Sequence, residues 1–212
     1  MSAQPERGAP ALAANGDEDE LARAELYGLL ARLWHAPPDA ALLARFRAPA
    51  VHAPQSGGAL GAAWQALAAV LRETTPEAAA AEHAALFVAI GKPEVFAYGS
   101  YYLSGYLNEK PLAQLRADLA PLGLTRAVDA LETEDHVAYV LEVMRYLIAG
   151  DDAAVCTLPQ QERFFRKHVQ TWLEALCDAV VAHPRADVWR AVAEMTRAFV
   201  QVETQAFDML DS

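Results

Sequence analysis

Residues 137–149 read VAYVLEVMRYLIA, and their apolar side chains recur every three or four positions. This spacing places one apolar stripe along a single face of an α-helix. The next residue, Gly150, is expected to end the helix, because glycine favours the position just after the last turn. A helix with such a stripe is stable only when other elements cover it. The stripe consists of Val137, Val140, Leu141, Met144, Leu147 and Ile148.

The same helical spacing continues on both sides of this stretch. Thr75 and Pro76 form a typical helix start, with threonine as the cap and proline in the first turn. No segment shows the two-residue alternation of a half-buried strand. The sequence therefore predicts an all-α, single-domain helical bundle of eight or nine helices without an internal repeat. The predicted helices cover residues 17–36, 38–46, 59–73, 76–88, 111–122, 137–149, 159–182 and 185–209.

The N-terminal residues differ from the rest of the chain. Residues 1–16 are rich in alanine, proline and glycine and show no period, which predicts a disordered tail. Asp17 is expected to cap the first helix, and the acidic residues that directly follow it suit the positive end of the helix dipole. The predicted folded domain therefore covers residues 17–212.

The composition is apolar and acidic. Of the 212 residues, 54% are hydrophobic, so the chain can bury a sizeable core. The formal net charge of −11 repels phosphate groups, which argues against nucleic acid and anionic membrane surfaces as partners. An arginine-bearing peptide would be attracted, although the same charge also serves simply to keep a protein in solution.

The sequence predicts a cytoplasmic protein without stable membrane insertion. No apolar run is long enough to span a bilayer, and residues 1–15 lack the basic start and apolar stretch of a signal peptide. The two cysteines, Cys156 and Cys177, do not form a C-x-x-C motif. Their number and spacing argue against a disulfide framework and a cysteine zinc site.

The motifs of common enzyme classes are missing from the sequence. It contains no H-E-x-x-H, no Glu-x-x-His and no G-x-S-x-G motif. Gly91-Lys92 continues into Pro93 and therefore does not complete a phosphate-binding loop. We expect no catalytic residue, no metal ligands and no cofactor. A helical enzyme with a metal site assembled from distant residues is the alternative from another class.

Two segments have an unusual composition. Residues 89–107 combine five aromatic residues with several glycines, which indicates either an irregular plug of the core or a binding surface. Residues 132–136 read ETEDH and directly precede the stretch 137–149. Glu134 or Asp135 can cap that helix, and the acidic cluster beside His136 can equally receive a cationic group such as an arginine. The residues alone leave both pairs of interpretations open.

Taken in order, four segments resemble motifs of the TorD/DmsD family, chaperones for molybdenum-containing oxidoreductases exported by the twin-arginine route. The resemblance extends over residues 20–205. Each motif alone is weakly specific, whereas four in the order of the family are strong. This sequence departs from the family pattern at His83, where tyrosine is usual, and at Thr133, which replaces a proline. The segments are RAELYGLLARLW at 23–34, EHAALFVAIG at 82–91 with YGSYYL at 98–103, ETEDH at 132–136 and FRKHVQTW at 165–172.

The resemblance implies a TorD-like helical fold and a chaperone rather than an enzyme. Its partner would be the precursor of a molybdoenzyme of the DMSO reductase or formate dehydrogenase type. The chaperone would bind the twin-arginine signal peptide of this precursor and shield the apo form until its cofactor is inserted, before export. The resemblance is compatible with a monomer and with a segment-swapped homodimer.

The resemblance also implies roles for particular residues in peptide binding. Glu132, Asp135 and His136 would face the arginine pair or the backbone beside it. His168 and Trp172 of the fourth segment would hold the bundle together rather than touch the peptide. A groove for the apolar part of the leader would be lined by Leu86, Phe87, Tyr98 and Tyr102, with Tyr27 joining its wall.

Two alternatives lie within the same superfamily. The client could be a non-exported respiratory subunit of the nitrate reductase type, in which case it would carry no twin-arginine leader. A guanine nucleotide is a second candidate ligand, although the sequence offers no phosphate loop for it. The sequence does not select the client enzyme, the oligomeric state, or whether the predicted tail becomes ordered on binding.

Overall fold

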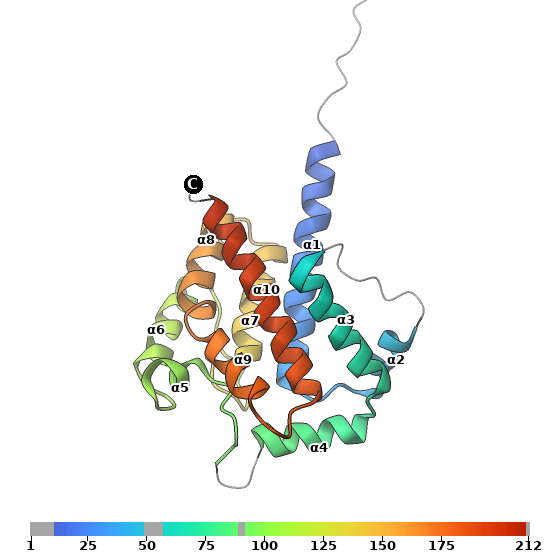
Figure 1. Cartoon of the computed structure of the whole chain (residues 1–212). Helices are drawn as coiled ribbons and strands as arrows, with labels where there is room; N and C mark the ends of the chain where they lie inside the picture. Colours follow the sequence, from blue (N-terminus) through green and yellow to red (C-terminus); the bar gives the residue numbers. More distant parts are fainter. Residues whose placement is uncertain (1–10, 49–56, 89–91, 211–212) are drawn as a thin grey trace, which may run out of the picture.

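The computed structural model describes residues 11–48, 57–88 and 92–210. Within these ranges the chain forms ten α-helices and no strand, so the predicted all-α fold is confirmed (Figure 1). A 3-10 turn, Ala120–Leu122, and a π-helical turn, Phe165–Val169, complete the regular structure. The helices are α1 Ala11–His35, α2 Ala40–Arg47, α3 Gly58–Glu73, α4 Pro76–Phe87, α5 Gly99–Ser104, α6 Lys110–Leu119, α7 Val137–Ala149, α8 Leu158–Phe164, α9 Leu173–Val181 and α10 Val188–Leu210.

The apolar stripe of α7 lies at the centre of the core. Its residues from Val137 to Leu147 are buried, and Ile148 at its end is half-buried. Complete burial of such a side chain stabilises the fold by about 1.5–3 kcal/mol. The most extensive packing in the molecule joins α7 to α1, while α10 packs against both α3 and α9. The helix α1 therefore covers most of the apolar stripe of α7.

The remaining helices surround this centre. Figure 1 shows α5 and α6 on one side of the bundle and α2 and α3 on the opposite side. The helix α4 lies across the end of the bundle at which α1 ends. It begins as predicted, because the Thr75 side chain accepts a hydrogen bond from the backbone N–H of Ala78 and Pro76 occupies the first turn.

The predicted start of the first helix is wrong. Helix α1 begins at Ala11, so Asp17 lies inside it rather than at its cap, and residues 11–16 are helical rather than part of a tail. The helix starts earlier because of composition: residues 11–14 are all alanine or leucine, the strongest helix formers. The penalty of about 1 kcal/mol for Gly16 is too small to stop a helix of 25 residues. Residues 1–10 of the predicted tail lie outside the described residues.

The helix count exceeds the predicted eight or nine for two reasons. Helix α5 forms within the aromatic segment that was expected to be irregular, and its six residues are too few to show a period. The predicted helix 159–182 is interrupted, because the π-helical turn and the non-helical backbone of Trp172 separate α8 from α9. Trp172 has φ −144° and ψ −18°, which no regular helix contains.

A buried ionic network fixes α1 against α10. The Arg23 guanidinium donates to both oxygens of the Glu203 carboxylate at 2.8 and 2.9 Å, and to the Gln161 side chain at 2.9 Å. The Tyr27 hydroxyl donates to the same carboxylate at 2.8 Å. Burial and the Glu203 charge both hold the pKa of Tyr27 well above its ordinary value. Because Glu203 is only 3% exposed, its charge depends on these donors.

We predict that Glu203→Ala lowers the free energy of unfolding by about 3 kcal/mol, since it leaves Arg23 and Tyr27 without their shared acceptor. Urea unfolding at neutral pH measures the loss. Arg32→Ala is the matched control, because Arg32 pairs with Asp39 on the exposed surface and its loss costs less than about 1 kcal/mol. Equal losses in the two variants would contradict a stabilising role for the buried network.

Candidate functional site

Two chain segments pair where α5 and α7 begin. Tyr98 and His136 form an isolated antiparallel bridge. On either side of it, the Val137 N–H donates to the Ala97 carbonyl at 2.8 Å and the Gly99 N–H donates to the Asp135 carbonyl at 2.9 Å. The aromatic segment and the ETEDH segment, which are separate in the sequence, therefore form one local structure.

Asp135 holds this local structure together. Its carboxylate accepts hydrogen bonds from the Ser100 backbone N–H at 2.9 Å and from the Thr133 hydroxyl at 2.6 Å. The side chain is buried, so these donors replace the water that an exposed carboxylate would bind. Thr133, which stands where the family pattern has proline, thus contributes a bond that proline cannot make. Asp135 positions α5 and is not exposed to a ligand.

His136 provides the cap of α7, for which Glu134 or Asp135 was expected. Its Nδ1 accepts a hydrogen bond from the Ala138 backbone N–H at 3.2 Å, and the ring is 7% exposed. The pKa of His136 is lowered to about 4, chiefly by burial; the nearby His35 and His83 also lower it, while Glu132 and Asp135 oppose the shift. The imidazole is therefore neutral at pH 7 and accepts through Nδ1.

Glu132 is the carboxylate of the segment that lies among aromatic side chains. It is half-buried, and the Tyr98 hydroxyl donates a short hydrogen bond to it. Burial and the Glu132 charge raise the pKa of Tyr98, so the phenol keeps its proton and stays a donor. A carboxylate that accepts one hydrogen bond from a phenol still has lone pairs with which to accept hydrogen bonds from a cationic ligand.

Tyr98, which donates to this carboxylate, belongs to a group of four neighbouring rings, and we refer to His35, Tyr98, His136 and Tyr139 as the ring cluster. The His136 ring centroid lies 5.2 Å from that of Tyr98, 5.9 Å from that of Tyr139 and 6.5 Å from that of His35. His35 and Tyr139 are 5.8 Å apart. The last residue of α1, the aromatic segment and the first turn of α7 each contribute to the cluster.

Helix α4 adds His83 and Phe87 beside the ring cluster. Their ring centroids are 5.2 Å apart, and the His83 ring lies 5.1 Å from Trp189 of α10. Burial lowers the pKa of His83, and the nearby His35 lowers it further against the effect of Glu132. The site therefore combines the Glu132 carboxylate with imidazoles at His83 and His136 that carry no charge at pH 7. Such a site attracts a cation that can also stack on aromatic faces.

The glutamate beside His83 has a different task. The Glu82 carboxylate accepts hydrogen bonds from the backbone N–H groups of Asp187, Val188 and Trp189 at 2.9, 3.1 and 2.9 Å. It therefore caps the N-terminus of α10 from another helix and fixes α4 against it. This contact places His83 and Phe87 relative to Trp189.

The structure brings together some of the predicted site residues and separates others. Glu132, Asp135, His136 and Tyr98 are neighbours, and Phe87 joins them through His83. Tyr102 instead stacks on Trp172 at a centroid distance of 6.0 Å. The prediction that Tyr27 and Leu86 line a groove is wrong for this structure, because both side chains are 0% exposed and belong to the core.

Sequence reasoning missed His35 and Tyr139. Both carry a signal that could have found them: His35 lies two residues before Pro37, where the first predicted helix ends, and Tyr139 follows His136 by three positions. A spacing of three places Tyr139 on the same helical face as the capping histidine. Their meeting depends on the packing of α1 against α7, which the sequence motifs do not specify.

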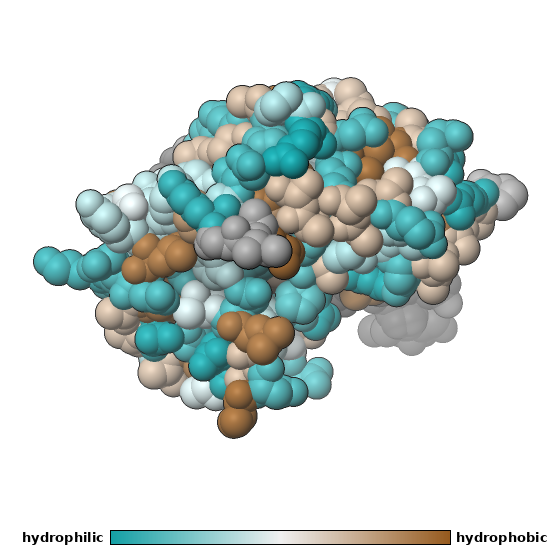
Figure 2. Space-filling model, turned by 90° about the horizontal axis from the view of Figure 1, so that it is seen from below, coloured by the Kyte–Doolittle hydropathy of each residue, from teal (hydrophilic) through white to brown (hydrophobic). Residues whose placement is uncertain are grey.

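The end of the molecule that carries α4 faces the viewer in Figure 2. Its apolar residues form separate patches among hydrophilic ones rather than one continuous band. Val88, directly after α4, is 61% exposed, and Leu131, directly before Glu132, is 93% exposed. Apolar side chains thus flank the site residues on both contributing segments.

The described part of the chain contains no group of three or more His, Cys, Asp or Glu residues arranged to hold a metal ion. Among the helices of that part, none is long and apolar enough to cross a membrane.

A sequence model described as the nitrate reductase delta subunit matches residues 54–178, more than half of the chain. The chain belongs to this family. The matched residues include α3 to α8 and therefore both segments that form the local structure around Asp135. The resemblance to the TorD/DmsD chaperones that the motifs indicated is confirmed.

Curated relatives of this nitrate reductase delta family member are named chaperone protein TorD. The protein of that name from Vibrio cholerae serotype O1 is 28% identical over 138 residues, which cover 62% of this chain and 63% of the relative. The one from Photobacterium profundum is 24% identical over 140 residues, which cover 62% of this chain and 65% of the relative. The chain thus spans slightly less than two thirds of the length of the curated relatives that it matches.

We predict that the stability of the protein falls as the pH is lowered from 7 to 5. The pKa of His136 is about 4 in the folded protein and near 6.5 in an unfolded chain, so the unfolded chain binds more protons between these values. This histidine alone is expected to remove about 2 kcal/mol from the free energy of unfolding at pH 5.

Chemical unfolding of wild type and His136→Asn at both pH values measures this contribution. Asparagine keeps a capping acceptor for α7 but does not titrate, so the variant should lose less stability on acidification than the wild type. An equal pH dependence of the two proteins would show that His136 is not the group that takes up the proton.

Proposed function

We propose that this protein is a maturation chaperone that binds the twin-arginine leader of a molybdenum-containing oxidoreductase precursor. The observation that carries the proposal is the half-buried Glu132 carboxylate, which accepts from Tyr98 beside the uncharged imidazole of His136. Membership of the nitrate reductase delta subunit family and relatives named chaperone protein TorD support it. The precursor would be of the DMSO reductase or formate dehydrogenase type.

The charge of the site suits an arginine. The Glu132 carboxylate can accept two parallel hydrogen bonds from one guanidinium in place of the single bond from Tyr98. The uncharged imidazoles of His83 and His136 do not repel the cation, and the rings beside them offer faces on which a guanidinium stacks. The net charge of −11 adds a longer-range attraction that steers a basic leader toward the protein.

The apolar part of a leader requires apolar area next to this carboxylate. Phe87 is half-buried, and the exposed Val88 and Leu131 lie beside it and beside Glu132 in the sequence. An amphipathic helix binds such a surface through a few apolar anchors. We therefore assign Phe87 and Tyr98 to direct contact, while Asp135 and His136 act indirectly by holding α5 and α7.

The proposed setting is the cytoplasm, where a precursor is available before export. We assign no enzymatic activity to the chain, since the relatives that it matches are named as chaperones. Binding of the leader would delay export while the apo form of the client is shielded. The oligomeric state proposed is the monomer described here, with a segment-swapped homodimer as the alternative.

A second candidate function follows from the family description, which names a nitrate reductase subunit. In that case the client would be a respiratory molybdoenzyme subunit that is not exported and has no twin-arginine leader. The same carboxylate and ring cluster would then receive a basic N-terminal segment of another kind. Capture of clients from the native host under inducing growth conditions, with their N-termini read by mass spectrometry, separates the two candidates.

We predict that Glu132→Gln weakens binding of a synthetic twin-arginine leader peptide by roughly tenfold or more, because a charge-assisted hydrogen bond is lost. Calorimetry or fluorescence anisotropy at low ionic strength measures the effect, since salt screens it. Replacing both arginines of the peptide by glutamine should produce a similar loss with the wild-type protein and little further loss with the variant.

The matched control is Glu77→Gln, which removes the same charge from the exposed first turn of α4. Its affinity for the peptide should stay within about twofold of the wild type, because it retains the local contact and loses only screened, long-range attraction. Equal effects of the two variants would mean that net charge, and not Glu132, binds the arginines.

A further inference from the structure

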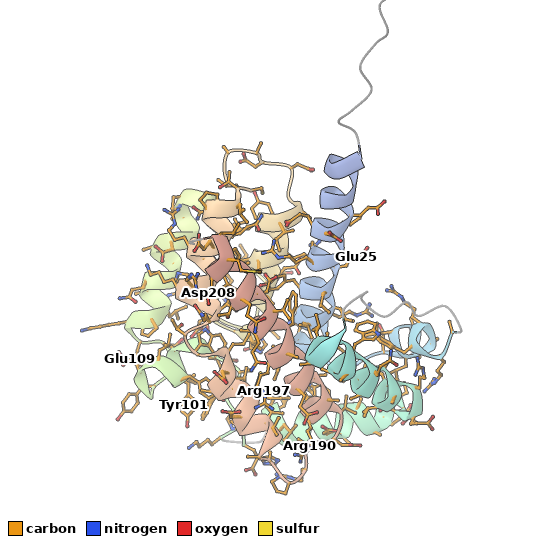
Figure 3. All side chains as sticks on the ribbon, turned by 45° about the horizontal axis from the view of Figure 1, so that its top comes forward. Glu25, Tyr101, Glu109, Arg190, Arg197 and Asp208 are labelled. Atoms are coloured by element: carbon orange, nitrogen blue, oxygen red, sulfur yellow. The ribbon has the colours of Figure 1, made fainter. Side chains whose placement is uncertain are left out.

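Helix α5 carries the ring of Tyr102 and directly follows Tyr98, and it is held from two sides. On one side, Asp135 accepts hydrogen bonds from the first backbone N–H groups of the helix. The other side rests against Trp172, which belongs to the fourth motif of the sequence. Figure 3 shows this side of the bundle, where Tyr101 marks α5 and Glu109 marks the start of α6.

The backbone of α5 lies directly on the Trp172 indole. A Cβ atom added to Gly99 would lie 2.9 Å from Cε2 and 3.1 Å from Nε1 of this ring, closer than side chains pack. The Tyr102 ring stacks on the same indole with an angle of 19° between the planes. The Trp172 side chain therefore fixes both the position of the α5 backbone at Gly99 and the orientation of the Tyr102 ring.

The indole itself is held rigidly. It is 3% exposed, and its N–H donates a hydrogen bond of 2.7 Å to the His168 carbonyl. In a regular α-helix this carbonyl would accept from the backbone N–H of Trp172, which here points at Val169 instead. Because the π-helical turn interrupts the helix, the indole N–H of Trp172 donates to the His168 carbonyl in place of the backbone N–H.

The π-helical turn is anchored in the same region. The His168 ring lies 2.6 Å from the Asp118 carboxylate of α6, and α6 packs against α5. The contacts therefore form a closed ring: α5 contacts Trp172, Trp172 bonds His168, His168 contacts α6, and α6 packs against α5. This closed arrangement resists displacement of the indole.

We propose that Trp172 is a positioning residue for peptide binding, an inference that rests on the proposed function. It fixes α5 so that Asp135 reaches Ser100 and the Tyr98 hydroxyl reaches Glu132. This role goes beyond holding the bundle together, because a shift of α5 would disturb the Glu132 site without unfolding the protein.

The test is the variant Gly99→Ala and its compensation by Trp172→Phe. The alanine methyl group must displace the buried indole or α5, and the affinity for a twin-arginine leader peptide should fall by at least about tenfold. Phenylalanine lacks the fused ring and makes room for the methyl group. The double variant should therefore recover affinity to within about threefold of Trp172→Phe alone, a non-additive result expected of residues in contact.

Hydrogen exchange in the peptide-free protein supplies a second readout. The amides of residues 99 and 100 both donate to Asp135, so their exchange should be faster in Gly99→Ala and slowed again in the double variant. Gly28→Ala is the matched control, because its added methyl group meets only the flexible Arg145 side chain. Its binding and exchange should equal those of the wild type.

The outcomes separate the two proposals. If the wild-type protein does not bind the peptide, the proposed function fails, while the exchange rates still decide whether Trp172 positions α5. Unchanged exchange and affinity in Gly99→Ala, or no recovery in the double variant, would overturn the inference. If Gly99→Ala does not fold, Trp172→Leu provides the remaining test, since removal of the ring should speed exchange at residues 99–102.

Discussion

The buried carboxylate of Asp135 is the contact on which the arrangement of α5 and the start of α7 depends. An ionised carboxylate in the interior is costly unless donors surround it, and here the Ser100 N–H and the Thr133 hydroxyl do so. Thr133 belongs to the same segment as Asp135, whereas the Ser100 N–H is available only when α5 is in place. The requirement for these hydrogen bonds therefore couples two segments that are more than thirty positions apart in the sequence.

Electrostatics distinguishes the roles of neighbouring acidic residues. The Asp135 carboxylate accepts hydrogen bonds from buried donors of the protein. The Glu132 carboxylate accepts one from the Tyr98 hydroxyl and can also accept from a cation. The imidazoles of His83 and His136 stay uncharged because burial opposes protonation. The local surroundings of Glu132 therefore distinguish it from the other acidic residues of the chain, which net charge alone does not.

Periodicity predicted the long helices well, because one buried face leaves a regular apolar pattern, as in α7. It could not identify α5, which is shorter than two turns, or the break at Trp172, which depends on contacts with Gly99 and Tyr102. Motifs singled out the acidic segment 132–136, whose role in binding stays a prediction, but they did not reveal that Tyr27 and Leu86 are buried in the core, since an apolar position in a helix does not show which neighbour covers it. His35 and Tyr139 were missed because they meet only through tertiary packing.

Adjacent residues 82 and 83 of one motif make different kinds of contact. Glu82 accepts hydrogen bonds from three N-terminal amides of α10, while the ring of His83 lies near those of Phe87 and Trp189. Position 82 therefore tolerates little variation in any protein built this way, because aspartate is too short and glutamine is uncharged. A change at position 83 would alter the surroundings of Phe87 and Trp189, while Glu82 beside it continues to hold α4 against α10.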